Sequence, residues 1–249
     1  MHRALQGLVA VVASWIVLVP SAPAALVADY QFNNNLQSSV GSPPDLQNVG
    51  VGNAFVADTV GGQPRTVLQF PMGGGVLLTP TSGVISSGIY TIVALFRFDE
   101  ISGYRRIVDF KDPPVDKGLY SLDGFLNFFD SAIGASAVIP AATYVQVALT
   151  RDGSDQVVGY VNGAQQFAFL DSGNDGIIVG NTLRFFKDDG SEESAGAVSR
   201  IRLFDTALSA AEVAALERPN PAPALAPFGL VCVGGVLLAV GLRRLRNQV

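Results

Sequence analysis

The sequence predicts an all-β protein, built as an antiparallel sandwich or barrel, with one short helix near its end. Short runs rich in β-branched and aromatic residues recur along the chain, with Gly, Pro, Asn and Asp between them. Only residues 209–217 of this region carry a helical signature. Many short strands separated by turn residues are typical of antiparallel sandwiches and barrels.

Two strand segments are especially informative. In residues 89–98, IYTIVALFRF, both alternating sets of side chains are mostly apolar, which predicts a central strand buried on both faces. In residues 157–169, VVGYVNGAQQFAF, Asn162 and Gly163 supply the two positive-φ positions of a type I′ turn, so we expect a two-residue hairpin. The remaining strand candidates are TVLQF (66–70), YRRIVDF (104–110), GFLNFF (124–129), YVQVALT (144–150), NTLRFF (181–186) and VSRIRLF (198–204).

The predicted helix closes this region. Ser209 and Glu212 have the S-x-x-E spacing of a capping box, in which each side chain satisfies a backbone N–H of the first helical turn. The alanine-rich segment after Ser209 favours a short helix.

The first 24 residues predict a secretory signal peptide. His2 and Arg3 precede the uncharged run 4–19, and Ala22 and Ala24 occupy the small-residue positions of a cleavage site. We therefore expect cleavage after Ala24 and export of the chain from Ala25 onward. An uncleaved signal anchor is the alternative.

The other end of the chain predicts a membrane tail. Residues 218–227 are proline-rich and predict an extended linker, and residues 228–249 predict a transmembrane segment. An arginine cluster after the apolar run predicts a cytoplasmic end. This cluster is Arg243, Arg244 and Arg246.

This tail, RPNPAPALAPFGLVCVGGVLLAVGLRRLRNQV, resembles the PEP-CTERM type of C-terminal sorting signal, in a variant form. The resemblance implies a Gram-negative source and an exosortase-like enzyme that acts at the proline motif containing Pro219 and Pro221. Asn220 stands where that family has Glu, so the processing enzyme and cleavage itself stay open. A plain membrane anchor would have the same hydropathy.

The predicted exported region, residues 25–217, is acidic and chemically restricted. It holds all 21 acidic residues but only 11 of the 16 basic ones, which gives a net charge of −10 and argues against a nucleic-acid partner. His2, Trp15 and Cys232, each the single residue of its type, lie outside this region. A Ser-His-Asp triad, a cysteine nucleophile, a His- or Cys-ligated zinc ion and a disulfide are thereby excluded.

A second resemblance covers nearly all of residues 25–217. YVQVALTRDGSDQVVGYVNGAQQFAF, and then NTLRFFKDDGSEESAGAVSRIRLFDTALSAAEVAALE, resemble the laminin-G-like, concanavalin A-like jelly-roll modules of bacterial surface proteins. The resemblance implies one antiparallel β-sandwich jelly roll for residues 25–217. Tyr144-Val145-Gln146 replaces the Trp-His-His that often begins the corresponding family strand. The fold hosts lectins, adhesion modules, glycanases and lyases, so it does not select among them.

No catalytic residue is predicted. Glucanases that this chain resembles in fold use an E-x-D-x-E strand, which places paired carboxylates on one face. The five Glu residues of the exported region have no such spacing; they are Glu100, Glu192, Glu193, Glu212 and Glu217. A lyase would use a Tyr or His base with a neutralising Arg, and Tyr104-Arg105-Arg106 is the one cluster of that kind in the sequence.

The sequence also suggests a calcium hypothesis. The laminin-G resemblance implies a rim cation held by loop oxygens, and calcium takes about six to eight of them. Residues 109–116 (DFKDPPVD) and 187–193 (KDDGSEE) are acidic loop candidates. If they lie at one end of the sandwich, Asp112 and Asp188 or Asp189 would share the ion. Charges that only solubilise the loops are the alternative.

We therefore expect a noncatalytic, exported module that serves adhesion or glycan association at the cell surface or in the extracellular matrix, with polysaccharide or a surface protein as partner. Without a tryptophan in the exported region, Tyr104 is the candidate for sugar contact. A purely structural matrix protein and a cryptic glycan-active hydrolase or lyase are the rival hypotheses.

Overall fold

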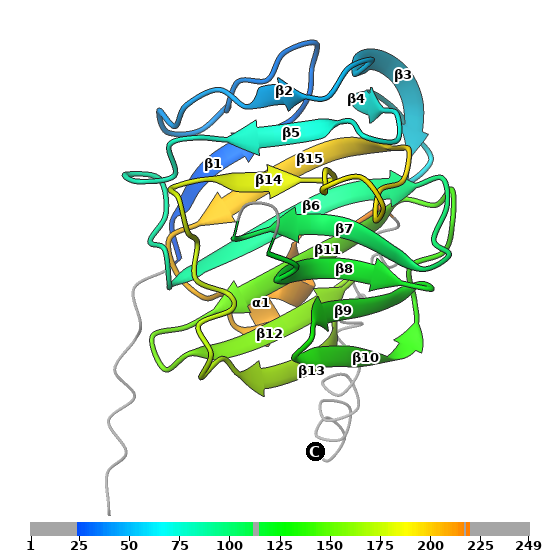
Figure 1. The fold of residues 1–249 in the computed structure, drawn as a ribbon. Coiled ribbons are helices and arrows are strands. Elements are labelled where there is room, and N and C mark those ends of the chain that lie inside the picture. Colours follow the sequence, from blue (N-terminus) through cyan, green and yellow to red (C-terminus); the bar gives the residue numbers. More distant parts are fainter. Residues whose placement is uncertain (1–23, 112–114, 217, 220–249) are drawn as a thin grey trace, which may run out of the picture.

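The computed structural model describes residues 24–111, 115–216 and 218–219, which form two antiparallel β-sheets packed face to face (Figure 1). The eight-stranded sheet has the order β13-β12-β11-β6-β15-β4-β3, with β1 beside β15. The seven-stranded sheet has the order β10-β9-β8-β7-β14-β5-β2. The predicted all-β antiparallel sandwich is therefore confirmed.

The strands of the eight-stranded sheet are β1 (Leu26–Tyr30), β3 (Ala54–Val60), β4 (Gln63–Phe70), β6 (Tyr90–Phe98), β11 (Val145–Arg151), β12 (Gln156–Val161), β13 (Ala164–Leu170) and β15 (Gly196–Phe204). The strands of the seven-stranded sheet are β2 (Gln47–Val49), β5 (Gly75–Leu78), β7 (Tyr104–Asp109), β8 (Gly118–Leu122), β9 (Phe125–Phe129), β10 (Ala132–Ala137) and β14 (Leu183–Phe185).

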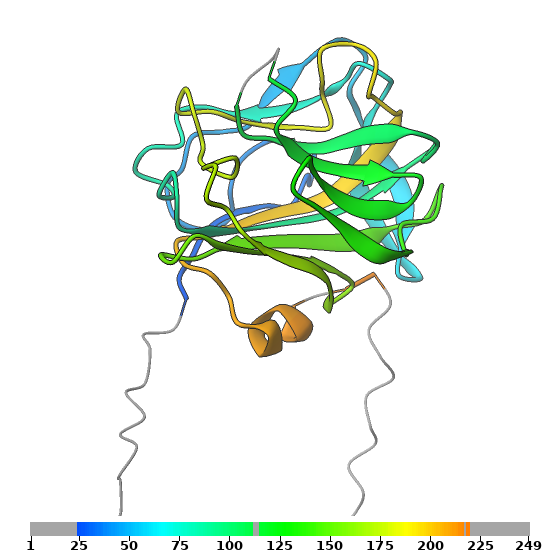
Figure 2. The same ribbon diagram turned by 60° about the horizontal axis from the view of Figure 1, so that its bottom comes forward.

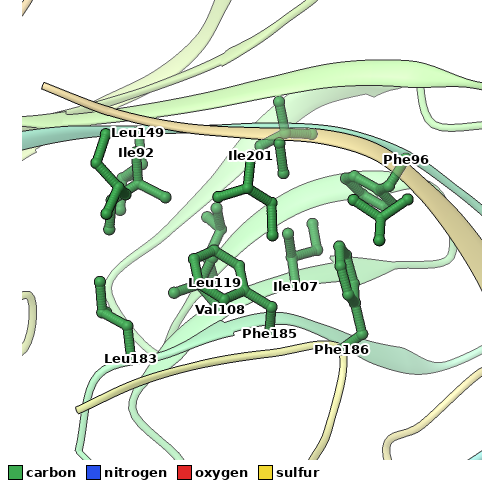
Figure 3. Close-up of a cluster of buried hydrophobic side chains, with 14 of the residues drawn as sticks. Ile92, Phe96, Ile107, Val108, Leu119, Leu149, Leu183, Phe185, Phe186 and Ile201 are labelled. Atoms are coloured by element: carbon green, nitrogen blue, oxygen red, sulfur yellow. The ribbon is translucent and has the colours of Figure 1, made fainter. Parts of the chain in front are cut away.

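The core fills the space between the sheets, where apolar side chains of both inner faces meet (Figure 3). Ile92, Leu149 and Ile201 extend from the eight-stranded sheet toward Leu119 and Phe185 of the other sheet. Phe96, Phe98 and Phe167 are buried there as predicted, and Phe169 is half-buried against the same cluster. A single continuous core of this size accounts for stability without a disulfide.

Local sequence signals are confirmed in their predicted places. β6 lies between β11 and β15, and its side chains are buried on both faces. Asn162 (φ 50°) and Gly163 (φ 80°) form the turn between β12 and β13. Since both φ values are positive, the turn matches the right-handed twist of its strands.

The single helix of the described residues, α1 (Ala210–Ala215), begins at the predicted capping box. The Ser209 side chain accepts from the Glu212 N–H, and Glu212 Oε2 accepts from the Ser209 N–H at 2.8 Å. Figure 2 shows the helix against the outer face of the eight-stranded sheet. There, buried Val213 packs in a cluster with Tyr160 and Phe204.

The predicted terminal segments lie mostly outside the described residues. These are the signal peptide up to residue 23, Pro221, the apolar segment 228–249 and its three arginines. Within the described part of the chain, no helix has the length and apolarity needed to span a membrane. Pro219 is buried beside Gly61, and Arg218 Nη2 donates to Ala214 O at 2.8 Å, so the first residues of the predicted linker pack on the domain.

Candidate functional site

The candidate site lies on the outer face of the seven-stranded sheet. Arg106 of β7 is the cross-strand partner of Tyr120 on β8, and Tyr120 is the partner of Asn127 on β9. Directly opposed residues of antiparallel strands extend from the same face. A bulge after Arg106 lets both Ile107 and Val108 face the core (Figure 3). This leaves Arg106 on the outer side of the sheet.

Arg106 is held by three contacts although it lies on an outer face. Its Nε and Nη2 donate to Asp188 Oδ2 and Oδ1, both at 2.9 Å, and its guanidinium carbon is 4.1 Å from the centroid of the Tyr120 ring. Both members of the ion pair are at most 2% exposed at their side chains. A planar guanidinium suits both the bidentate contact and the stacking contact.

Gly118 of β8 makes room for this arginine. A Cβ atom at Gly118 would lie 2.5 Å from Val108 O and would overlap Arg106 Nη1. Only the absence of a side chain at this position lets the guanidinium lie flat beside the strand.

Three aromatic rings complete the face. Tyr104, Tyr120 and Phe129 contact one another edge to face, with centroid separations of 5.5, 5.6 and 6.3 Å. Tyr120 is buried, whereas Tyr104 and Phe129 are half-exposed. We call Tyr104, Arg106, Tyr120, Phe129 and Asp188 the Arg106 cluster.

Acidic side chains surround this cluster. Asp116, with a 55% exposed side chain, lies 3.7 Å from Arg106 Nη2. Burial, together with the charges of Asp188 and Asp116, raises the pKa of Glu192, although the Tyr120 hydroxyl counteracts this shift. Burial also raises the pKa of Asp109 against the opposing effects of Arg106 and Arg184. The site therefore combines one deeply held cation with carboxyl groups of unusual proton affinity.

Arg106 Nη1 and Asn127 Oδ1 are buried at this face and have no hydrogen-bond partner among the described residues. Buried polar atoms in native proteins almost always have a partner, which can be ordered water or a bound molecule. The face therefore retains unused hydrogen-bonding capacity.

The predicted site residues are distributed over three different environments. Tyr104 belongs to the Arg106 cluster. Asp188 is buried with both carboxylate oxygens engaged by Arg106, whereas Asp189 is exposed and its N–H donates to Asp188 Oδ1 at 2.9 Å. Asp112 lies outside the described residues, and within the described ranges no group of three or more His, Cys, Asp or Glu side chains is arranged to hold a metal. Calcium binding stays a prediction.

Sequence reasoning did not identify Tyr120, Asn127 and Phe129 as neighbours of Arg106. A usable signal was present: Asp123 (φ 50°) and Gly124 (φ 85°) form a two-residue turn between β8 and β9. An Asp-Gly turn fixes the hairpin register and therefore the pairing of Tyr120 with Asn127. The approach of Asp188 from a distant segment has no such local signal.

Two antiparallel sheets packed around one core define the class of jelly-roll β-sandwiches. Residues 72–214 match the concanavalin A-like lectin/glucanases superfamily, so the chain belongs to this family. The laminin-G-like, concanavalin A-like resemblance seen in the sequence is thus confirmed. No curated protein matches the sequence.

Similar solved structures share the fold at low identity. Domain 4 of AbnA, an extracellular GH43 arabinanase from Geobacillus stearothermophilus solved with arabinotriose, has a TM-score of 0.59 and 19% identity over 77% of this chain and 97% of that chain. The binding domain of Paraclostridial Mosquitocidal Protein 1 has a TM-score of 0.60 and 14% identity over 76% and 51% of the two chains.

A structure of botulinum neurotoxin type C has a TM-score of 0.57 and 14% identity over 77% of this chain and 50% of that chain. Cell entry of that toxin depends on interaction with two ganglioside molecules. The chain thus matches about half the length of these two toxin chains. At such identities the similarity concerns the fold.

Proposed function

We propose that the protein is a noncatalytic glycan-binding module that uses the Arg106 cluster. The observation that carries this proposal is the set of edge-to-face contacts that half-exposed Tyr104 and Phe129 make with each other and with buried Tyr120, beside a fixed arginine. Aromatic rings offer apolar surface to the C–H faces of sugars, while nearby carboxylates accept hydrogen bonds from sugar hydroxyls. The arabinotriose complex of the AbnA domain supports this ligand class.

The cluster is suited to binding because its parts are already ordered before a ligand arrives. Arg106 is anchored by Asp188, and each ring is packed against the other two. A preorganised site loses little conformational entropy when it binds.

The test is the affinity of the full-length chain for a panel of neutral oligosaccharides that includes arabinotriose. We expect Tyr104→Ala to weaken binding at least tenfold, whereas Tyr104→Phe keeps most of it, because the ring supplies the contact. Leu170→Ala is the matched control, since it truncates a 63% exposed apolar side chain at the end of β13 in the other sheet. Equal affinities of the Tyr104→Ala and Leu170→Ala variants would refute the proposal.

We propose further that the module is exported and then held or sorted by its C-terminal tail at the cell surface or in the extracellular matrix. β1 begins at Leu26, and the Ala25 N–H donates to Asp205 Oδ1 at 3.1 Å, so the folded part begins next to the predicted cleavage site. We expect N-terminal sequencing of the cell-associated protein to start at Ala25. Accumulation of uncleaved chain in the cytoplasm would contradict export.

A cryptic glycan-active enzyme is the second candidate, favoured by the raised pKa values of Asp109 and Glu192 beside Arg106. Carboxyl groups with raised pKa values can act as general acids. Release of reducing ends from the bound glycan, abolished by Glu192→Gln, would establish catalysis. Binding without turnover supports the module, and the absence of any ligand would leave a structural matrix role.

A further inference from the structure

The eight-stranded sheet contains a notch in one edge of β15. β1 pairs with the second half of β15, from Phe204 back to Ile201, and β4 pairs with its first half, from Gly196 to Val198. Between these two partners, no strand of the described residues pairs with Ser199 or Arg200 on this edge. A β-bulge against β6 falls at the same two residues.

This notch opens into a polar groove of about 470 Å³. Gln31 and Asn33 line it from the segment after β1, Pro64, Arg65 and Thr66 from β4, and Ser199 and Arg200 from β15. A second hollow of about 150 Å³ shares Gln31 and Asn33 and continues along residues 35–39, which are rich in amide and hydroxyl groups. The volume of the larger groove is in the range of small-ligand sites.

An unusual backbone conformation positions the amide side chains. Phe32 has a φ of 55° and is fully buried in the core. A bulky residue seldom adopts positive φ, and such conformations cluster at functional sites. This conformation places the Phe32 ring in the core while Gln31 and Asn33, on either side of it, line the groove.

The groove also contains a buried hydroxyl group that makes no hydrogen bond within the described residues. Ser199 is 2% exposed, and its Oγ has no hydrogen-bond partner among the described residues. An orphaned buried hydroxyl in a lined groove indicates a position where a bound group completes the hydrogen bonding.

Charge in the groove is largely neutralised. Arg200 Nε and Nη2 donate to the two carboxylate oxygens of Asp29, both at 2.7 Å. Gln31 Nε2 donates to the same carboxylate at 2.8 Å. Arg65, the other charged residue of the lining, also takes part in a polar or electrostatic interaction. The remaining polar side chains of the lining are amides and hydroxyls, which both donate and accept hydrogen bonds. Such groups match the hydroxyls of a neutral sugar better than a charged ligand.

We infer that this groove is a second carbohydrate-binding site, which takes a neutral glycan by hydrogen bonding. It lies in the other sheet from the Arg106 cluster, and its aromatic-free lining distinguishes it from that site. With two sites, the module would bind one polysaccharide chain at two places, or two chains at once, and gain avidity.

The experiment is an NMR titration of the isotope-labelled full-length chain in detergent with neutral xylohexaose and arabinotriose, and separately with trigalacturonic acid. We expect the neutral sugars to shift the backbone amide signals of residues 31–39 and 65–66. Ser199→Ala should weaken the affinity measured at these amides about threefold to tenfold, the effect of one lost hydrogen bond. Asn33→Ala should do the same.

Ser121→Ala is the matched control, because Ser121 is also buried with an unpartnered Oγ but does not line the groove. Both serine variants should unfold at the same midpoint temperature as the wild type. A loss of affinity in Ser199→Ala would then come from lost ligand binding and not from loss of folding.

If the sugars change the NMR signals of Tyr104 and Phe129 but not those of residues 31–39, this inference is overturned and the proposed function stays intact. Shifts only in the groove would support the inference and refute the Arg106 cluster as the binding site. Absence of shifts in the groove with the neutral sugars, or shifts caused by the uronic acid trimer alone, would overturn the neutral-glycan assignment.

Discussion

Arg106 and Asp188, 82 positions apart in the sequence, form a fully buried bidentate ion pair on the outer face of a sheet. Desolvating both charges is costly, and the two parallel hydrogen bonds together with the Tyr120 ring offset this cost. The pair fixes the segment after β14 against β7. It thereby shapes the face that we assign to glycan binding.

Asp188→Asn should destabilise the protein strongly. The variant removes the buried carboxylate that neutralises Arg106 and leaves only the exposed Asp116 at 3.7 Å. We expect this to cost about 3–5 kcal/mol, or roughly 6–20 °C in the unfolding midpoint. Thermal unfolding of the full-length chain in EDTA measures this effect. Asp189→Asn, at the exposed neighbour, should change the free energy of unfolding by no more than about 0.5 kcal/mol. Equal midpoints for the two variants would contradict the ion pair.

Gly118→Ala tests the packing of the same arginine. The new methyl group would overlap Arg106 Nη1 and approach Val108 O, so we expect a loss of about 1–3 kcal/mol and weaker glycan binding. Gly153→Ala is the control, because the nearest atom to its Cβ would be Ile89 Cδ1 at an ordinary 3.4 Å. Denaturant unfolding compares the two variants. An unchanged free energy of unfolding in Gly118→Ala would show that the Arg106 guanidinium can take another position.

Asp29 should contribute a stability that depends on pH. Burial by itself would raise the pKa of its carboxyl, but hydrogen bonds from Arg200, Gln31 and Ser39 hold the pKa below its ordinary value of 3.8. The stabilisation is therefore complete well above pH 3.8 and is lost as pH falls through the lower pKa of the folded state.

Asp29→Asn should cost about 1.5–3 kcal/mol at neutral pH, and the gap to the wild type should narrow below about pH 4. Unfolding free energies measured from about pH 7 to about pH 2.5 give both quantities. Asp45→Asn, at an exposed carboxylate, serves as the control and should stay within about 0.5 kcal/mol of the wild type. A gap that is independent of pH would refute the role of the ionised carboxylate.

The calcium hypothesis has a direct thermal test. A site filled at about a hundred times its dissociation constant adds about 2.7 kcal/mol, which should raise the midpoint by roughly 5–10 °C between EDTA and millimolar calcium. Since Asp188 is engaged by Arg106, the exposed Asp189 is the carboxylate expected to contribute, and Asp189→Asn should abolish the shift. An unchanged midpoint in the wild type would remove calcium from the function.

Much of the fold was predictable because its signals are local. The apolar alternation of residues 89–98, the Asn162-Gly163 turn and the Ser209 capping box each depend on neighbouring residues, and each is confirmed. The candidate site was predictable only in part. Tyr104 and Arg106 were recognisable as a cluster. The role of Asp188 was not predictable, because Asp188 and Arg106 lie on segments that are far apart in the sequence.

By itself, the sequence determined the strand content, the closing helix, the acidic charge and the absence of His and Cys chemistry from the predicted exported region. Backbone propensity and side-chain alternation act over a few residues, so a linear pattern is enough to express them. The tertiary structure alone decided that Asp188 neutralises Arg106, that Gly118 admits the guanidinium, and that β1 and β4 leave a notch beside Ser199. These features depend on pairings between distant segments, whose register is fixed only when the two sheets close around their common core.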